Sequence, residues 1–330
     1  MPKELLNYLK NYLIEYQTIT SFSTDINFGI EIEAIPNNPF LSKWDIINLL
    51  PELLDYEYAK YDDNPYDYWV LKTDDTIEKE NGYEIASKIL KNNESSWKQI
   101  QTITDTLKPY FHVDELCSAQ IHFDAERLIG EDANKLINIL KMWTLYEDIL
   151  FRFSYGEFNG PRKLISSFAV PIAKNTYKKF IKQKDFSYEN TLNTYIGNKY
   201  NSLNLTKIPT TRGTIEVRMP NGTLNKTIWQ NLINTFGHFL EYSVSNNFDD
   251  EKTTYEIRNM SFPKKSLYTT INDYSKPNLP KALELADTIF DSDLDKLNFL
   301  RQYLKDDVFS PTPTLDICEN KMVLSKKITY

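Results

Sequence analysis

The chain has 330 residues, of which 41% are hydrophobic and 25% charged, and 38 Lys and Arg against 46 Asp and Glu give a formal net charge of -8. This composition excludes a disordered or collagen-like chain, and the acidic balance predicts neither a nucleic-acid partner nor a membrane partner. Cys117 and Cys318 are too few for a disulfide framework, and no apolar run approaches the ~20 residues of a membrane span. We therefore expect a cytoplasmic protein.

The segment 1–17 predicts an amphipathic helix, because Leu5, Leu9 and Leu13 recur at helical spacing. It lacks the basic end and apolar block of a leader peptide. Residues 27–35 then alternate apolar and polar side chains, which is the period of a half-buried strand.

Further elements follow in chain order, and together they predict an α+β fold in one folded unit. Helices are predicted at residues 44–50, where Pro51 ends the pattern, and at 96–110, 136–153 and 227–244. Strands are predicted at residues 68–71, 76–79, 83–87, 116–124, 200–205 and 214–219, with turns at Asn81-Gly82 and Asn221-Gly222. Beyond residue 248 we expect short helices through 283–289 and 294–304, then a Pro-containing loop at 310–313.

The polar faces of the predicted strands carry the informative residues, because successive strand side chains point to opposite sides of a sheet. Phe28, Ile30 and Ile32 share one face of their strand, while Glu31 and Glu33 share the other. If the strands form one antiparallel sheet covered by the two long helices, the open face gathers Glu31, Glu33, Glu84, Gln120, His122, Glu216 and Arg218.

This set of side chains predicts a metal-assisted phosphoryl-transfer site. Glu31 and Glu33, ~7 Å apart on one face, repel each other unless a cation lies between them. Carboxylate oxygens suit Mg²⁺ or Mn²⁺, and Arg218 can neutralise a transferring phosphoryl group. A Glu-x-Glu strand alone is more often a solvated face. Three separate strands with acid, imidazole or guanidinium side chains on the same side favour a phosphoryl-transfer site over a solvated face.

Five short segments carry a resemblance to a known family. They are FGIEIE at 28–33, KTDD at 72–75 with GYEIAS at 82–87, CSAQIHF at 117–123, KYNSLNL at 199–205 and GTIEVR at 213–218. In this order they resemble the amidoligase family, a branch of the carboxylate-amine ligases with the glutamine synthetase and glutamate-cysteine ligase fold. The resemblance covers about residues 26–245, and no segment is specific alone. It implies a curved antiparallel sheet with a catalytic concave face backed by long helices, a catalytic domain at 1–248 and a helical C-terminal extension at 249–330.

The resemblance implies an ATP-dependent ligase that uses Mg²⁺ or Mn²⁺. An amino-acid or peptide carboxylate would attack the γ-phosphate of ATP, and an amine or ammonia would displace phosphate to form an amide. The implied metal ligands are Glu31, Glu33, Glu84, Glu216 and the position of Gln120. Arg218 and Glu216 would be catalytic, and the nucleotide and substrate would contact His122, Tyr200 and Asn204. Arg162 and Lys163 are candidate phosphate contacts, although such pairs in connecting segments are usually surface charge.

One departure leaves alternatives open. The family usually has His-x-His where this chain has Gln120-Ile121-His122, and an amide is a weaker metal ligand than an imidazole. One metal would then be lost or weakly held, unless Asp75 or Glu78 compensates. Two other functions therefore stay open: a kinase on the same fold, and a degenerate module that binds peptides with a protein partner docked on the C-terminal helices.

Overall fold

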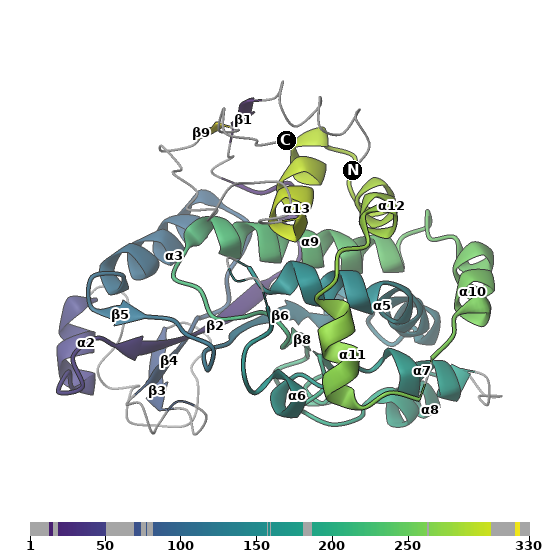
Figure 1. Cartoon of the computed structure of the whole chain (residues 1–330), viewed down its shortest axis with the longest axis horizontal. Helices are drawn as coiled ribbons and strands as arrows, with labels where there is room; N and C mark the ends of the chain where they lie inside the picture. Colours follow the sequence, from purple (N-terminus) through teal and green to yellow (C-terminus); the bar gives the residue numbers. More distant parts are fainter. Residues whose placement is uncertain are drawn as a thin grey trace.

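The computed structural model describes residues 13–15, 19–50, 69–73, 77, 82–156, 158, 160–180, 187–262, 264–304 and 321–323. Figure 1 shows the main sheet beside a set of helices, with the long helices α5 (Ala133–Ser154) and α9 (Lys226–Val244) running close to its central strands.

Seven strands form an open antiparallel sheet in the order β3-β4-β2-β6-β8-β7, and β5 also pairs with β2. They are β2 (Phe28–Pro36), β3 (Val70–Thr73), β4 (Tyr83–Ala86), β5 (Phe111–His112), β6 (Ala119–Asp124), β7 (Leu203–Asn204) and β8 (Thr214–Val217). The long strand β2 has β4 on one side and β6 on the other. The predicted α+β fold is confirmed.

The predicted long helices are also present, and side chains cap their first turns. Asn93, Asp132 and Asn225 each accept a hydrogen bond from a backbone N–H at the start of α3 (Glu94–Leu107), α5 and α9. The other helices are α2 (Lys43–Leu49), α4 (Ala125–Leu128), α6 (Ile165–Phe168), α7 (Ala173–Phe180), α8 (Tyr188–Tyr195), α10 (Asp250–Asn259), α11 (Leu267–Tyr274), α12 (Leu279–Ile289) and α13 (Asp293–Leu304).

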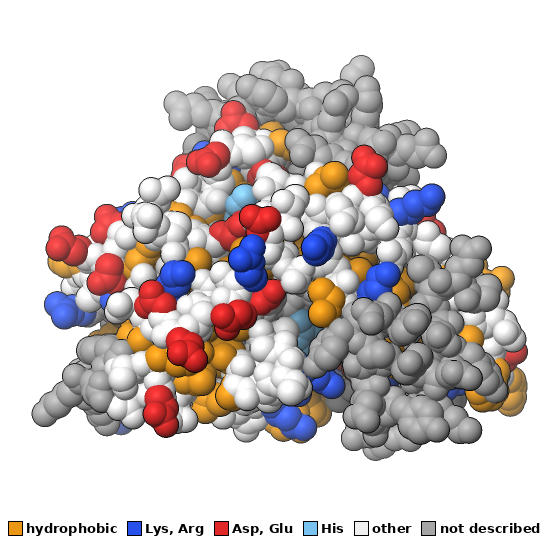
Figure 2. Space-filling view, turned by 180° about the vertical axis from the view of Figure 1, so that it is seen from behind, with side chains coloured by type: hydrophobic (Ala, Val, Ile, Leu, Met, Phe, Trp, Pro, Cys, Tyr) orange, Lys and Arg blue, Asp and Glu red, His pale blue; other side chains and the backbone are white. Residues whose placement is uncertain are grey.

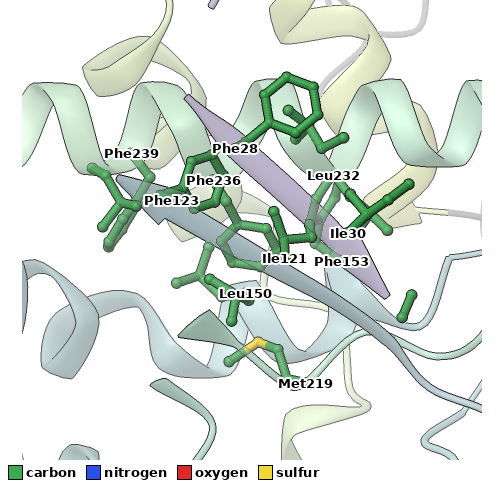
Figure 3. Packing of buried hydrophobic residues seen from close by; sticks show 14 of the residues in the cluster. Phe28, Ile30, Ile121, Phe123, Leu150, Phe153, Met219, Leu232, Phe236 and Phe239 are labelled. Carbon is green, nitrogen blue, oxygen red and sulfur yellow. The ribbon is translucent and has the colours of Figure 1, made fainter. Parts of the chain in front are cut away.

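The apolar face of the sheet forms the core together with α5 and α9. Phe28 and Ile30 of β2 and Ile121 and Phe123 of β6 are all buried, and they pack with Phe236 of α9 in one cluster (Figure 3). Burial of each such side chain stabilises the fold by roughly 1.5–3 kcal/mol. Because alternate residues of a strand face opposite ways, this packing leaves the polar residues of β2 and β6 on the other face.

The predicted N-terminal helix is wrong for residues 13–15. They form β1 (Leu13–Glu15), which pairs antiparallel with β9 (Lys321–Val323). The partner strand lies about 300 residues further along the chain. Helical spacing reflects only neighbouring residues and carries no information about such a distant partner. The rest of that predicted helix, the strand at 76–79 apart from Ile77 in a turn, and the loop at 310–313 lie outside the described residues.

Two further expectations differ from the structure around β8. Asn221-Gly222 does not close a hairpin, because Asn221 forms an isolated antiparallel bridge with Ser118 and its backbone N–H donates to the Ser154 carbonyl. Between β6 and β7 the structure also adds α6, α7 and α8. Each has eight residues or fewer, which is too short for a clear helical period.

The helices beyond residue 248 pack on the long helices of the fold. α10, α11, α12 and α13 all contact α5, and the last two also contact α9. Arg152 of α5 donates from Nε to the Tyr303 carbonyl at 3.0 Å, from Nη2 to the Leu304 carbonyl at 3.3 Å, and from Nη1 to the Ser275 carbonyl. A buried guanidinium therefore joins α5 to the ends of α11 and α13.

The described surface mixes charges of both signs. On the face seen in Figure 2, acidic and basic side chains are interspersed. Among the described helices, none combines the length and the hydropathy that crossing a membrane would require.

Candidate active site

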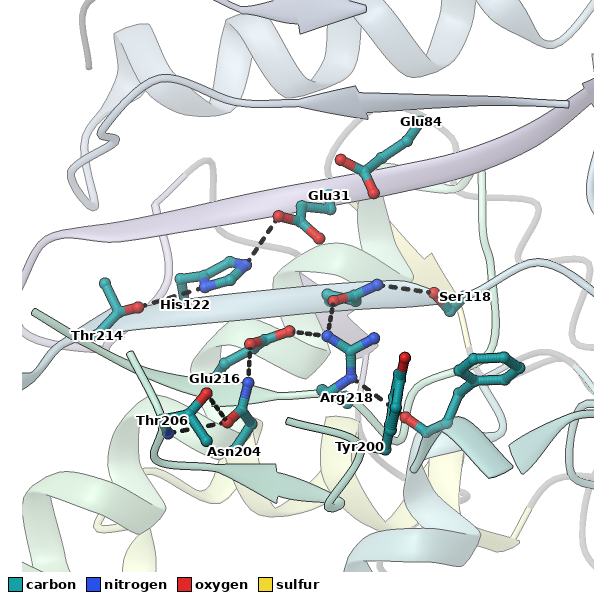
Figure 4. A network of polar contacts seen from close by, with 12 residues as sticks. Glu31, Glu84, Ser118, His122, Tyr200, Asn204, Thr206, Thr214, Glu216 and Arg218 are labelled. Carbon is teal, nitrogen blue, oxygen red and sulfur yellow. Dashed lines mark hydrogen bonds and ion pairs between the residues drawn. The ribbon is translucent and has the colours of Figure 1, made fainter. Parts of the chain in front are cut away.

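Strand register brings the polar residues of four strands into one group. Glu31 of β2 lies opposite Gln120 of β6. His122 of β6 lies opposite Glu216 of β8, and Glu216 in turn lies opposite Asn204 of β7. Figure 4 shows the side chains of Glu31, His122, Asn204 and Glu216 lying together on one side of these strands.

Glu31, His122 and Glu216 form a compact triad. Each offers one ligand atom, and these three atoms lie within 4.8 Å of one another. His122 Nε2 is buried from solvent and lies 3.2 Å from Glu31 Oε1. A buried imidazole nitrogen that faces two carboxylates suits a metal ligand. The triad therefore fits one divalent cation.

Burial and charge act in opposite directions on the triad. Burial would raise the pKa of Glu31, but the charge and hydrogen bond of His122, with Lys72 and Arg218, lower it to about 2. Burial would lower the pKa of His122, but the charge and hydrogen bond of Glu31 and the charge of Glu216 raise it. The group thus holds a negatively charged Glu31 that attracts cations.

Arg218 is fixed beside the triad by three acceptors. Its Nη1 donates to Gln120 Oε1 at 2.8 Å and forms an ion pair with Glu216, while its Nε donates to the Phe168 carbonyl at 3.2 Å (Figure 4). Because three contacts define the plane of the guanidinium, its orientation is set before any ligand binds. Arg218 is thus arranged to receive negative charge at a defined place.

Asn204 steadies the other side of Glu216. Its Nδ2 donates to Glu216 Oε2 at 2.5 Å, and its own oxygen accepts from the backbone N–H and the hydroxyl of Thr206 at 2.9 and 2.7 Å. Asn204 is fully buried. In the described structure it therefore orients an acid of the triad.

Two of the predicted metal ligands, Glu33 and Glu84, lie apart from the triad. Glu33 accepts from the backbone N–H of Ser118 at 2.6 Å, from the Ser118 hydroxyl at 2.5 Å and from Gln120 Nε2 at 3.3 Å. Glu84 lies opposite Glu33 in the β2–β4 register, and its Oε1 is 3.4 Å from Lys72 Nζ. Asp75 and Glu78 fall outside the described residues.

The remaining predicted contacts divide into near and far residues. Arg162 is buried and donates to the Arg218 carbonyl at 3.3 Å, so it lies directly behind the site. Tyr200 packs edge-on against Phe168 with ring centroids 5.3 Å apart, and it lies beside Arg218 in Figure 4. Lys163 instead forms a largely exposed ion pair with Glu115 at 3.3 Å. The structure does not bring its ammonium to the triad.

A pocket of about 290 Å³ opens next to the triad. Its charged lining consists of three basic side chains and three acidic ones, together with His122: Lys72, Lys88, Arg212, Glu31, Asp124 and Glu126. This volume is near the lower end of small-molecule sites, which span about 300–1,000 Å³. A pocket that offers cations to phosphate oxygens and carboxylates with an imidazole to a metal suits a polyphosphate bound together with a divalent metal.

The sequence predicted no role for the three basic residues of the pocket. Lys72 belongs to a four-residue strand, and its alternation places it on the polar face opposite Glu84. That signal was available, whereas Lys88 lies in the segment between β4 and α3, and Arg212 in the segment between β7 and β8. Connecting segments carry no period from which a direction can be inferred.

The geometry defines a class of protein: an open antiparallel sheet with a carboxylate–imidazole triad, an adjacent fixed arginine and a pocket lined by acidic and basic side chains. A comparison with protein families matches residues 24–239 to the family described as "Putative amidoligase enzyme". The match spans more than half of the chain, so the chain belongs to this amidoligase family, which implies ligase activity. The resemblance inferred from the five segments is confirmed. A search of curated proteins gives no significant match.

Proposed function

We propose that this protein is an ATP-dependent ligase that joins a carboxylate to an amine through an acyl phosphate. The carboxylate belongs to a small molecule or a peptide, and the acceptor is an amine or ammonia. One observation carries the proposal: Arg218 lies fixed against Glu216 of the triad, and Glu31 and His122 of the same triad line a pocket that also contains Lys72, Lys88 and Arg212.

The triad supports Mg²⁺ or Mn²⁺ as the metal. Two carboxylates and one imidazole nitrogen are suitable ligands, and the buried Nε2 of His122 is consistent with a bound cation. When bound there, the metal would offset the charge of the ATP phosphates. Lys72, Lys88 and Arg212 would hold the remaining phosphate charge from the pocket walls.

The proposed reaction has two steps, formation of an acyl phosphate and its attack by an amine. A carboxylate oxygen of the substrate attacks the γ-phosphorus, the bond to the β-phosphate oxygen breaks, and ADP leaves. The amine nitrogen then attacks the carbonyl carbon of the acyl phosphate, phosphate departs with the C–O electron pair, and the nitrogen loses a proton. Arg218 would act in the first step, where its fixed guanidinium beside the triad would offset the charge that develops on the transferred phosphoryl group.

Thermal stability with nucleotide and metal tests the proposed site. ATP with Mg²⁺ or Mn²⁺ should raise the melting temperature more than either component alone, since only ligands that prefer the native state stabilise it. Glu216→Gln should lose this joint effect, while Glu115→Gln, which alters an exposed acid paired with Lys163, should retain it. No joint shift in the folded wild-type protein would contradict the proposed site.

Product analysis separates the ligase from a kinase on the same fold. Mixtures of carboxylates and amines are incubated with ATP, and ADP, free phosphate and amide are quantified. A ligase releases free phosphate in step with amide and only when an amine is present. A stable phosphorylated product formed without any amine would instead favour a kinase.

A further inference from the structure

We propose that the site takes one divalent metal at the triad, and that the Lys72 ammonium occupies the place of a second cation between the triad and the Glu33–Glu84 pair. The inference rests on the proposed metal site and goes beyond it. It assigns Lys72 a role, and it specifies how many metals this sheet holds.

The acids of the sheet fall into two groups with different surroundings. The first is the triad of Glu31, His122 and Glu216, whose ligand atoms converge within 4.8 Å. The second is the cross-strand pair of Glu33 in β2 and Glu84 in β4, which face each other directly in the register. Side chains in such positions have Cβ atoms about 4.5–5.5 Å apart, so two carboxylates there repel when both are ionised. A positive charge beside them would relieve this repulsion.

Lys72 supplies that charge from the next strand. It lies opposite Glu84 in the β3–β4 register, and its Nζ is 3.4 Å from Glu84 Oε1. Lys72, Glu84 and Glu33 therefore form one row across three neighbouring strands. The Lys72 side chain is 30% exposed and lines the pocket, so its ammonium contacts one acid of the pair and is also accessible to a ligand in the pocket.

The contacts of Glu33 also argue against a second metal. Both of its carboxylate oxygens accept from Ser118, one from the backbone N–H and the other from the hydroxyl, and Gln120 Nε2 points at the same carboxylate. These donors and the Lys72 ammonium together offset the negative charge of the pair, so a second divalent cation is not needed while Lys72 is present. Among the residues that the structure describes, the triad is also the one group of three or more potential ligands close enough to hold a metal.

Replacing a metal by an ammonium changes how the site holds an anion. Lys72 can donate hydrogen bonds to a phosphate or carboxylate oxygen, and a chelator cannot remove it. A divalent ion would instead bind the anion by direct coordination. We therefore expect that one bound metal suffices for full nucleotide binding.

Counting bound Mn²⁺ by calorimetry, in the presence of a non-hydrolysable ATP analogue, tests the inference. Wild-type protein should bind one Mn²⁺ per chain, and Lys72→Arg, which keeps the charge, should also bind one. A count of two in the wild type would overturn the inference and leave the proposed function intact. A count of zero would overturn the proposed metal site itself.

A second measurement tests whether Lys72 stands in for a cation. In EDTA, Lys72→Ala should melt below the wild type by about 2–4 °C, because the repulsion between Glu33 and Glu84 is exposed. Excess Mg²⁺ should restore most of this loss in Lys72→Ala, beyond any shift it causes in wild type or in Lys88→Ala, a second pocket lysine. Failure of Mg²⁺ to restore stability would contradict the substitution of Lys72 for a metal.

Discussion

Gln120 holds Arg218 in place rather than facing the triad with its oxygen. Gln120 Oε1 accepts from Arg218 Nη1 at 2.8 Å, while its Nε2 points toward Glu33 Oε1 at 3.3 Å. Both ends of the amide are thus engaged by neighbours in the sheet. The amide that stands in place of the histidine expected from the resemblance therefore contacts Arg218 and Glu33.

We first predict that Gln120→His will leave metal affinity within about threefold of wild type, because position 120 faces Arg218 and Glu33. Calorimetric titration with Mn²⁺ measures this. Gln120→Leu serves as the matched variant, and it should lower the free energy of unfolding by about 1–3 kcal/mol, since it leaves buried polar partners unsatisfied. Tenfold tighter Mn²⁺ binding in Gln120→His would instead identify position 120 as a ligand.

Glu216→Gln should weaken Mn²⁺ binding by more than about 100-fold. Glu216 is buried and belongs to the triad, and loss of an outer partner of a metal ligand alone reduces affinity by about 10–100-fold. Glu115→Gln makes the same chemical change on the surface and should bind as wild type. Equal affinities for the two variants would show that Glu216 holds no metal.

Arg218→Lys should reduce ligase turnover by about 10²–10³-fold while Mn²⁺ affinity stays within a few fold. A lysine is a single point of charge and cannot reproduce the three contacts that fix the guanidinium plane. Turnover and Mn²⁺ binding are measured on the same preparation. Arg258→Lys, on the exposed surface of α10, is the control. Near-normal turnover in Arg218→Lys would mean that Arg218 has only a structural role.

Cys117 should be inert in the native protein. Burial raises the pKa of its thiol to about 12, so the thiolate is scarce throughout pH 7–9, and the side chain is fully buried. In a Cys318→Ser background, which leaves one thiol, a disulfide reagent should label Cys117 only after denaturation. Rapid labelling of the native protein that accelerates with pH would contradict the buried placement.

Arg152→Met should lower the free energy of unfolding by about 3 kcal/mol or more. The change removes a guanidinium that donates to the carbonyls of Tyr303, Leu304 and Ser275, and buried acceptors left without donors cost about 1–3 kcal/mol each. Urea unfolding of Arg152→Met and of the surface variant Arg258→Met gives the comparison. Equal stabilities would show that α11 and α13 do not depend on this anchor.

Local patterns in the sequence were sufficient to predict the α+β fold, a strand at 27–35 that the structure shows as β2, and helices at 136–153 and 227–244 that it shows as α5 and α9. Alternation and helical spacing are properties of neighbouring residues, so they can be recognised without knowing any partner. The polar faces of β2, β6 and β8 follow from the same period. The five short segments, taken in their order along the chain, were enough to identify the amidoligase family.

The tertiary structure alone decided which polar residues meet. Strand order and register place His122 opposite Glu216. Glu31 and Glu33 look equivalent in the sequence, yet Glu31 belongs to the triad while Glu33 accepts hydrogen bonds from Ser118. The β1–β9 pairing and the contact of Lys72 with Glu84 likewise depend on which strands become neighbours. The period of a strand determines the face on which a side chain lies. Its partner across the sheet is determined by long-range packing, which no local pattern encodes.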